Sequence, residues 1–239
     1  MLPEWTQIHA IILELERDGV VTRTFRRLDP QRQQVIVQAI LDEALEKGPA
    51  SINIKKVAER AGVALGSLYQ YFGNRDGLLE FSTRLCVHLL TSAFDQFRPM
   101  LAALPLREAL TYYLTGGLEW SQTMLGLIQF FGRAAYQGDP VLAEKVVRPV
   151  ADAMRLTMFE ILQAAQERGE IRADLDLDVT ARAIHAWTIA LGDSQLLPYL
   201  NNYFQVTTET IPFERALSNA IDLLVRGLCL DTAQQPTDH

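Results

Sequence analysis

The segment from Ser51 to Arg75 holds small and hydrogen-bonding side chains at a spacing that suits a recognition surface. These residues are Gly66, Ser67, Tyr69, Gln70 and Tyr71. Hydroxyl and amide groups donate and accept hydrogen bonds, which is the chemistry used to contact base edges and phosphates in DNA. An apolar core has little use for such side chains, so we expect this face to point outward.

Two short helices are predicted to position that face. Apolar residues recur at i, i+3, i+4 and i+7 on the first helix: Ile54, Val57, Ala58 and Ala61. Gly62 supplies the left-handed conformation that ends this helix, and Val63 fills the corner. The second helix then turns Leu68 and Phe72 inward. The pattern predicts a helix-turn-helix whose second helix lies against DNA.

The span from about Asp29 to Leu79 resembles the DNA-binding domain of TetR/AcrR-type regulators. The matching residues are Ala61-Gly-Val, Gly66-Ser-Leu-Tyr, Tyr71-Phe-Gly-Asn-Arg75 and Leu78-Leu79. An Ala-Gly-Val corner alone would also fit a plain helical hairpin, whereas the Leu-Tyr-x-Tyr-Phe sequence followed by a basic residue is more specific. The resemblance implies an all-α fold, with an N-terminal three-helix helix-turn-helix domain and a C-terminal helical domain for effector binding and dimerisation.

The resemblance also implies that the second helix enters the major groove. Gly66 would let the backbone approach DNA, and Ser67 and Gln70 would hydrogen-bond there. Two positions depart from the family pattern. Ala64 replaces the usual capping Ser or Thr, at a cost of about 0.5–2 kcal/mol of helix stability. Leu65 replaces a polar residue and would touch a thymine methyl group.

Phosphate contacts are expected around this reading face. Tyr69 and Tyr71 would offer hydroxyl groups while their rings pack on the domain, and Arg75 matches the family's basic contact after the aromatic pair. Asn53 falls where the first helix begins, so it can cap that helix beside N–H groups aimed at a phosphate. These contacts fix the position of the protein and carry little sequence information.

The charge distribution agrees with a DNA-binding module. The 239 residues carry a net charge of −7, which alone would argue against DNA binding. Residues 22–84, however, contain ten basic and seven acidic side chains, while both flanking regions are acidic. The basic excess therefore coincides with the helix-turn-helix, and the acidic remainder discourages non-specific adhesion to nucleic acid.

Other classes of function lack their usual motifs. Cys86 and Cys229 form no metal or disulfide framework, and there is no phosphate loop, nucleophile elbow or His-rich metal spacing. Asp174, Asp176 and Asp178 precede a helix, where capping and the helix dipole account for them. With no apolar run of 18 residues and no basic leader, we expect a cytoplasmic protein that is not an enzyme and needs neither cofactor nor metal.

Four regions are predicted along the chain. They are an N-terminal helical extension with a basic arm (1–28), the helix-turn-helix domain (29–74), a helical ligand-binding and dimerisation domain (75–230) and a disordered tail (231–239). Trp5, Ile8, Ile11, Ile12 and Leu15 form the apolar face of the extension's helix, which ends at Gly19. The following segment contains Arg23, Arg26 and Arg27, and is either an arm for the minor groove or a solvated linker that adds long-range attraction.

The remaining helices are predicted from periodicity and from the Pro and Gly residues that break it. Asp29-Pro30 begins a helix that Gly48-Pro49 ends, and a long helix runs from Arg75 to about Phe97, before Pro99. Further helices are expected at about 106–124, 125–137, 140–168, 179–203 and 212–230. No alternating pattern with hairpin turns is present, so no sheet is expected.

An effector pocket is expected among the aromatic and soft apolar residues of the middle helices. The candidates are Tyr113, Trp120, Met124, Phe131, Met158, His185 and Trp187. Such a set can line an apolar cavity with a few polar groups, although each member also fits an ordinary core position. His185 fits a satisfied core histidine equally well.

The last two long helices are the expected dimer face. One carries Ala181, Ile184, Ile189, Leu196 and Leu197, and the other carries Ala216, Ala220, Leu223, Leu224 and Leu228. The sequence therefore predicts a homodimeric regulator, most simply a repressor, that binds a palindromic double-stranded operator and is released by a small apolar effector. The alternative is a helical interaction protein with degenerate DNA binding; no membrane partner is expected.

Overall fold

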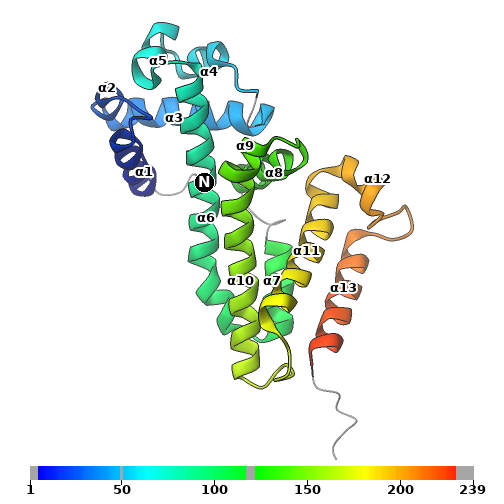
Figure 1. The fold of residues 1–239 in the computed structure, drawn as a ribbon. Helices are drawn as coiled ribbons and strands as arrows, with labels where there is room; N and C mark the ends of the chain where they lie inside the picture. The colour runs from blue at the N-terminus through cyan, green and yellow to red at the C-terminus, as the bar shows by residue number, and fades with distance from the viewer. Residues whose placement is uncertain (1–4, 49–50, 117–121, 230–239) are drawn as a thin grey trace, which may run out of the picture. The chain divides into compact units, whose positions relative to one another are not determined.

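The computed structural model describes residues 5–48, 51–116 and 122–229, and regular structure in these ranges is helical (Figure 1). The one β-type interaction among them is an isolated bridge between Thr208 and Ile211. The expectation of an all-α protein is confirmed. The chain forms two compact units. One comprises residues 1–92 with 121–150, and the other comprises residues 93–120 with 151–239.

The first unit contains the predicted DNA-binding helices. Its elements are α1 (Trp5–Arg17), α2 (Arg23–Arg26), α3 (Pro30–Lys47), α4 (Ile54–Ala61), α5 (Leu65–Phe72), the first part of α6 (Arg75–Ala103), α8 (Gln122–Tyr136), α9 (Pro140–Leu142), the π-helical turn η1 (Ala143–Val147) and the start of α10 (Arg148–Glu167). Asp29 caps α3 as expected, because its carboxylate accepts hydrogen bonds from the amides of Gln31 and Arg32 at 3.0 and 3.1 Å.

Close packing joins α3 to α8 within this unit. A Cβ built on Gly126 would lie 2.8 Å from Cδ1 and 3.2 Å from Cβ of Leu45, so the glycine allows the two helices to meet. Arg133 of α8 donates from Nη1 to the carbonyl oxygen of Leu45 at 2.6 Å. That bond satisfies a carbonyl in the last turn of α3, where no intrahelical partner exists.

The second unit comprises the remainder of α6 and α10, together with α7 (Leu106–Gly116), α11 (Leu177–Leu196), the 3₁₀ turn η2 (Pro198–Leu200), α12 (Asn201–Phe204) and α13 (Phe213–Leu228). Its core is apolar and includes Leu110, Met158, Ile161, Leu162 and Ile184. α13 contacts both α7 and α11, so it is packed on this core along one side.

An ion pair clamps the turn between α6 and α7. Arg168 donates to the carbonyls of Ala102 and Leu104 at 2.8 and 2.7 Å, and its Nε contacts Glu170 at 2.6 Å. The other carboxylate oxygen of Glu170 accepts from the amide of Leu106 at 2.6 Å. The hydrogen bond from Arg168, assisted by that amide, lowers the pKa of Glu170 below its ordinary value.

Three predicted helix boundaries were wrong. α6 continues through Pro99 to Ala103, because Pro99 is exposed and the uninterrupted helix buries Phe94 and Leu101 on either side of it. α8 begins at Gln122 rather than after Met124. α11 stops at Leu196 because Pro198 pushes the residue before it out of the helical region. The predicted tail, 231–239, lies outside the described residues.

The segment after Gly19 is neither an extended arm nor a solvated linker. It forms the short helix α2, in which Phe25 is completely buried. Thr22 caps this helix by accepting from the amide of Phe25 at 3.4 Å. Burial of Phe25, the single aromatic residue between the arginines of this segment, folds the segment onto the unit.

Candidate nucleic-acid interface and effector region

Asn53 begins α4 in the way the sequence predicted. Its side-chain oxygen accepts from the amides of Lys55 and Lys56 at 3.0 and 3.4 Å. Both lysines are exposed beside the helix N-terminus, where a positive end of the helix dipole adds to their charge. These lysines were not among the predicted contacts, although two adjacent lysines in the first turn after a capping residue are a recognisable anion-binding signal.

A buried carboxylate holds the start and the end of α4 against α3. Glu43 accepts from the amide of Asn53 at 3.3 Å and lies 3.5 Å from the guanidinium of Arg60. Arg60 also contacts Glu46 at 2.5 Å. Hydrogen bonds from Lys47 and then Arg60 lower the pKa of Glu46 to about 2, and Glu46 in turn raises the pKa of Arg60. These contacts fix the angle between the supporting helix and α4.

The corner and the start of α5 also match the sequence prediction. Gly62 lies in the left-handed region with φ of 62°. Ala64 occupies the N-cap position with extended backbone angles and provides no side-chain hydrogen bond to the helix. The recognition helix therefore begins without the usual side-chain cap, and the amide of Ser67 donates to the Ala64 carbonyl at 2.9 Å in its first turn.

Most of the predicted reading face of α5 is open to solvent. Gly66, Gln70 and Tyr69 are exposed, Tyr69 to 40% of its surface, and Leu65 and Ser67 are half-buried. Leu68 and Phe72 are buried, as predicted. A Cβ at Gly66 would meet no atom of the described chain within 4 Å, so the fold does not require glycine there. The contacts of the exposed and half-buried α5 residues with DNA remain predictions.

Tyr71 is the exception on this face: its ring packs on the domain instead of lying open to solvent, and the contact of its hydroxyl with a phosphate stays a prediction. The residue is 7% exposed, and its ring centroid lies 5.7 Å from that of Phe25. The partner ring comes from α2, an element that the sequence analysis did not recognise as folded. Tyr71 is therefore part of an aromatic cluster with Phe25, Phe72 and Phe81.

Arg75 lies immediately after the helix-turn-helix, as the first residue of α6, and is exposed. Asn74 accepts from the amide of Gly77 at 2.9 Å and so fixes the first turn of this helix. An exposed cation at a helix N-terminus that follows the recognition helix is well placed for a phosphate, and that contact remains a prediction.

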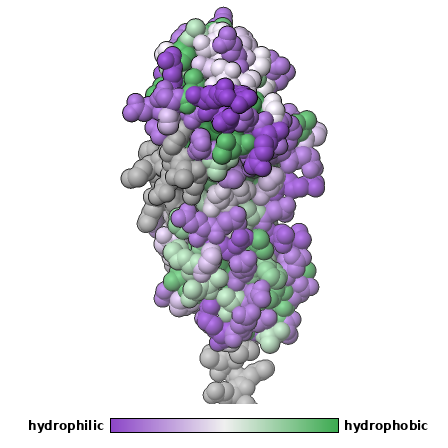
Figure 2. Space-filling view, turned by 90° about the vertical axis from the view of Figure 1, so that its left-hand side faces the viewer, coloured by the Kyte–Doolittle hydropathy of each residue, from purple (hydrophilic) through white to green (hydrophobic). Residues whose placement is uncertain are grey.

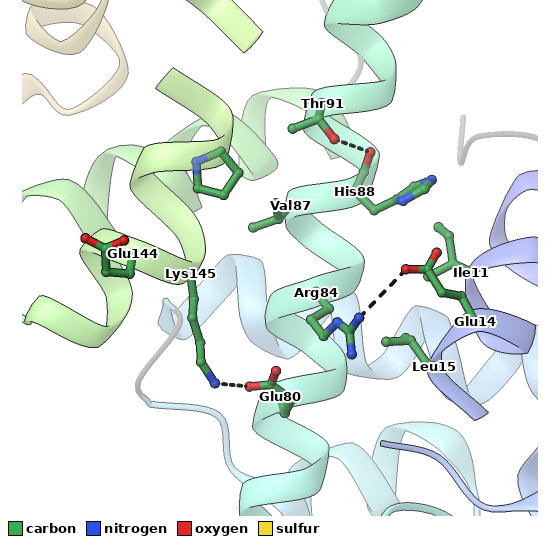
Figure 3. A pocket seen from close by; sticks show the side chains of 11 residues that line it. Ile11, Glu14, Leu15, Glu80, Arg84, Val87, His88, Thr91, Glu144 and Lys145 are labelled. Atoms are coloured by element: carbon green, nitrogen blue, oxygen red, sulfur yellow. Dashed lines mark hydrogen bonds and ion pairs between the residues drawn. The ribbon is translucent and has the colours of Figure 1, made fainter. Parts of the chain in front are cut away.

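A shallow pocket of about 350 Å³ lies elsewhere in the first unit, between α1, α6 and the η1–α10 segment (Figure 3). Ion pairs join several of its lining residues: Lys145 contacts Glu80 at 2.7 Å, and Arg84 lies 3.8 Å from Glu14. Arg84 also lies 2.5 Å from Asp18, which is outside the lining. Apolar contacts from Ile11, Leu15 and Val87 complete the lining. These ion pairs connect α1 and η1 to α6, and we assign no ligand to the pocket.

Two predicted effector residues lie in the second unit with unpartnered polar atoms. The hydroxyl of Tyr113 and Nδ1 of His185 are buried and make no hydrogen bond within the described ranges. The neighbouring Thr188 donates instead to the His185 carbonyl at 2.8 Å. Burial raises the pKa of Tyr113 and, together with the charge of Arg155, lowers the pKa of His185. Burial therefore disfavours the charged form of each group, and the side chain of Thr188 partly offsets this effect on the pKa of Tyr113.

The other predicted effector residues are dispersed. Met158 is buried in the core of the second unit, and Phe131 is buried in the first unit. Trp187 is 47% exposed and lines a groove of about 220 Å³ between α11 and α13, with Phe204 and Leu223. Trp120 and the side chain of Met124 lie outside the described residues.

The first unit thus has the construction of a helix-turn-helix DNA-binding regulator. A left-handed glycine separates two short helices, an asparagine caps the first, and the second presents an exposed polar face. None of the described helices combines the length and apolar character that crossing a bilayer requires.

Comparison with known proteins agrees with this class. The family model "Bacterial regulatory proteins, tetR family" matches residues 36–80. The repressor KstR of Mycolicibacterium smegmatis is 29% identical over 86% of this chain and 90% of its own. The regulator BetI 1 of Chromohalobacter salexigens is 34% identical over 40% of this chain, an alignment that spans 46% of that relative.

The fold of the chain is also similar to that of solved structures. A complex of SmeT with triclosan superimposes with a TM-score of 0.63 at 18% identity, over 87% of this chain and 96% of that chain. The helix-turn-helix region, residues 36–80, thus matches the tetR family of bacterial regulatory proteins, and the similarity to regulators such as KstR over most of the chain identifies a DNA-binding regulator rather than an enzyme.

Proposed function

We propose that the protein is a cytoplasmic homodimeric repressor that binds a palindromic operator and leaves it when a small, largely apolar effector binds. The observation that carries the DNA-binding part is the exposed face of α5, which presents Gly66, Tyr69 and Gln70 behind a correctly formed corner. Gln70 and Ser67 are the proposed base readers, with Leu65 beside them, because amide and hydroxyl groups match major-groove edges.

The homodimer is proposed to form through α11 and α13. Trp187 on one helix and Leu223 on the other are 47% and 53% exposed, and both line the apolar groove between these helices. Large apolar side chains grouped in this way favour a protein partner. A twofold dimer also reads two half-sites about 34–36 Å apart, or a multiple of this distance, whereas one helix-turn-helix reads too few base pairs.

The effector is proposed to bind in the second unit near Tyr113 and His185. Their buried hydroxyl and Nδ1 atoms would gain hydrogen bonds from a ligand that also fills apolar space. The complex of SmeT with triclosan is a structural neighbour with a bound small molecule. Release from DNA requires that the effector bind one conformation more tightly than the other.

Selection of genomic fragments by the wild-type protein, followed by fluorescence anisotropy, tests this proposal. The selected duplex is expected to bind at least about a thousandfold more tightly than a scrambled duplex at moderate salt. Gln70→Ala should reduce this preference while sedimentation still shows a dimer. Equal affinity for selected and scrambled duplexes would contradict the proposed function.

A further inference from the structure

We propose that the N-terminal extension is a second DNA-contacting element, in which Arg23 of α2 and Arg27 at the C-cap of that helix bind backbone phosphates beside the half-site that α5 reads. The inference rests on the proposed function, because it requires α5 to lie in a groove. It adds residues outside the helix-turn-helix and outside the part of the chain that the family model matches.

The first step of the argument is that α2 is joined directly to the recognition helix. The amide of Thr22 donates to the carbonyl of Tyr71 at 2.9 Å, and its hydroxyl donates to the carbonyl of Gln70 at 2.8 Å. Carbonyls in the last turn of a helix lack intrahelical donors, so Thr22 satisfies groups that α5 leaves open. Arg23, the next residue, therefore starts beside Gln70, a proposed base reader.

The second step is that the other end of α2 is fixed as well. Gln33 of α3 is buried, and its amide donates to the carbonyls of Phe25 and Arg26, both at 2.9 Å. Arg26 also forms an ion pair with Glu16 of α1. Figure 1 shows α2 beside α5 and α3 at the same end of this unit. Both ends of the short helix are thus tied to elements of the DNA-binding unit.

The third step concerns which side of α2 faces outward. Phe25 is fully buried, with its ring centroid 5.1 Å from that of Phe72 and 5.8 Å from that of Phe81. Arg23 and Arg27 are four residues apart, so they share one side of the helical turn, and Phe25, two residues from each, lies opposite. Burial of the aromatic ring therefore turns both guanidinium groups outward, and both residues are exposed.

The fourth step is the charge of this surface. The ion pairs found among the described residues use Arg26 but include neither Arg23 nor Arg27. Figure 2 views the α1–α2 side and shows hydrophilic side chains gathered over its upper part. Exposed arginines continuous with a DNA-reading face suit phosphates, which guanidinium groups bind through two parallel hydrogen bonds. Because α2 is already folded, binding does not have to order an arm.

The test compares Arg23→Gln/Arg27→Gln with wild type on the duplex selected by wild type, with affinity measured over a range of salt concentrations. Each lost phosphate contact should reduce the steepness of log K against log salt by about 0.9, which is about 1.8 for the two arginines of one subunit and about twice that for a dimer bound to both half-sites. Binding at low salt should weaken by about tenfold or more, and the preference for the selected over the scrambled duplex should remain.

Two further variants make the result specific. Arg107→Gln/Arg182→Gln removes two exposed arginines from the second unit and should leave the salt slope unchanged. Arg23→Lys/Arg27→Lys keeps both charges and should retain most of the slope. Circular dichroism checks that every variant has the helix content of wild type.

The outcomes separate this inference from the proposed function. Wild type without preference for any duplex would overturn both. A selective wild type whose slope and affinity are unchanged by Arg23→Gln/Arg27→Gln would overturn this inference alone. Loss of sequence preference together with affinity would also overturn it, since the extension would then act by orienting α5 and not by binding phosphates.

Discussion

At the residue scale, the reading face of α5 is separated from the residues that keep the helix folded. Leu68 and Phe72 are buried, whereas Gly66 and Gln70 are exposed and contribute little to the core. Substitutions on the exposed face should therefore change DNA affinity without an equal change in the free energy of unfolding. Tyr71 is the position where this separation fails, because its ring is part of the aromatic cluster.

Gly66→Ala tests that separation. A Cβ there would meet no described atom within 4 Å, and alanine is favoured over glycine in a helix by about 1 kcal/mol, so the free energy of unfolding should stay constant or rise by up to that amount. DNA affinity should fall by about tenfold, since an added methyl group holds the backbone off the groove. Urea unfolding and anisotropy measure the two quantities. Unchanged DNA affinity would remove the proposed role of this glycine.

At the element scale, the helices are held in place by contacts at their ends as well as by apolar faces. Asn53 and Glu43 fix the start of α4, Thr22 covers the end of α5, and Arg133 covers the end of α3. Each contact satisfies backbone groups that a helix terminus leaves without partners. The angle between helices is thereby set by polar contacts that periodicity alone does not reveal.

The junction of α3 and α8 gives an element-scale prediction. Gly126→Ala places a methyl group 2.8–3.3 Å from side-chain atoms of Leu45, and overpacking of this kind costs about 1–3 kcal/mol of unfolding free energy. Gly227→Ala is the matched control, because that helical glycine has no neighbour within 4 Å and alanine should be neutral or stabilising there. Equal stability of the two variants in urea would show that the α3–α8 contact is not tight.

The ion pair between Arg168 and Glu170 that clamps the α6–α7 turn should make the free energy of unfolding depend on pH. Because the folded-state pKa of Glu170 lies below its ordinary value near 4.5, its ionised form stabilises the fold above that value, and the contribution is lost as pH falls through the lowered pKa. Glu170→Gln should therefore lose less stability than wild type between about pH 5 and pH 3. Thermal unfolding at several pH values measures this. Glu167→Gln, an exposed change at the end of α10 and three residues before Glu170, should behave like wild type. Identical curves for Glu170→Gln and wild type would contradict the role of the clamp.

At the scale of the whole molecule, two compact units share the long helices α6 and α10. The first unit contains the helix-turn-helix, and the second contains the groove between α11 and α13. A helix that continues from one unit into the other gives effector binding a physical connection to the DNA-binding helices. Pro99, which the sequence analysis expected to interrupt this connection, lies within α6 without ending it.

The proposed dimer gives the prediction at this scale. Leu223 is 53% exposed, so Leu223→Asp should leave the subunit folded. The twofold symmetry would place this carboxylate in the apolar interface twice per dimer, which should weaken dimerisation. The dimer dissociation constant should rise more than about a hundredfold, and operator affinity should fall with it. Sedimentation velocity at micromolar concentration measures the change. Tyr203→Asp, at a position that is 80% exposed on α12, is the control; a dimer unaffected by Leu223→Asp would contradict the proposed face.

The sequence by itself determined the helical class, the helix-turn-helix with its Gly62 corner, the Asn53 and Asp29 caps and the missing cap at Ala64. These features depend on residues close together in the chain, whose periodicity and backbone preferences act locally. Only the tertiary structure decided that Tyr71 is buried, that α2 is folded onto α5 and α3, and that Trp187 lines a surface groove. The first two of these outcomes depend on Phe25 and Thr22, which lie at least 40 residues before α5 along the chain. A pattern of local spacing cannot specify such a distant contact. The contact forms because an aromatic side chain and unpaired helix carbonyls must find partners wherever the fold supplies them.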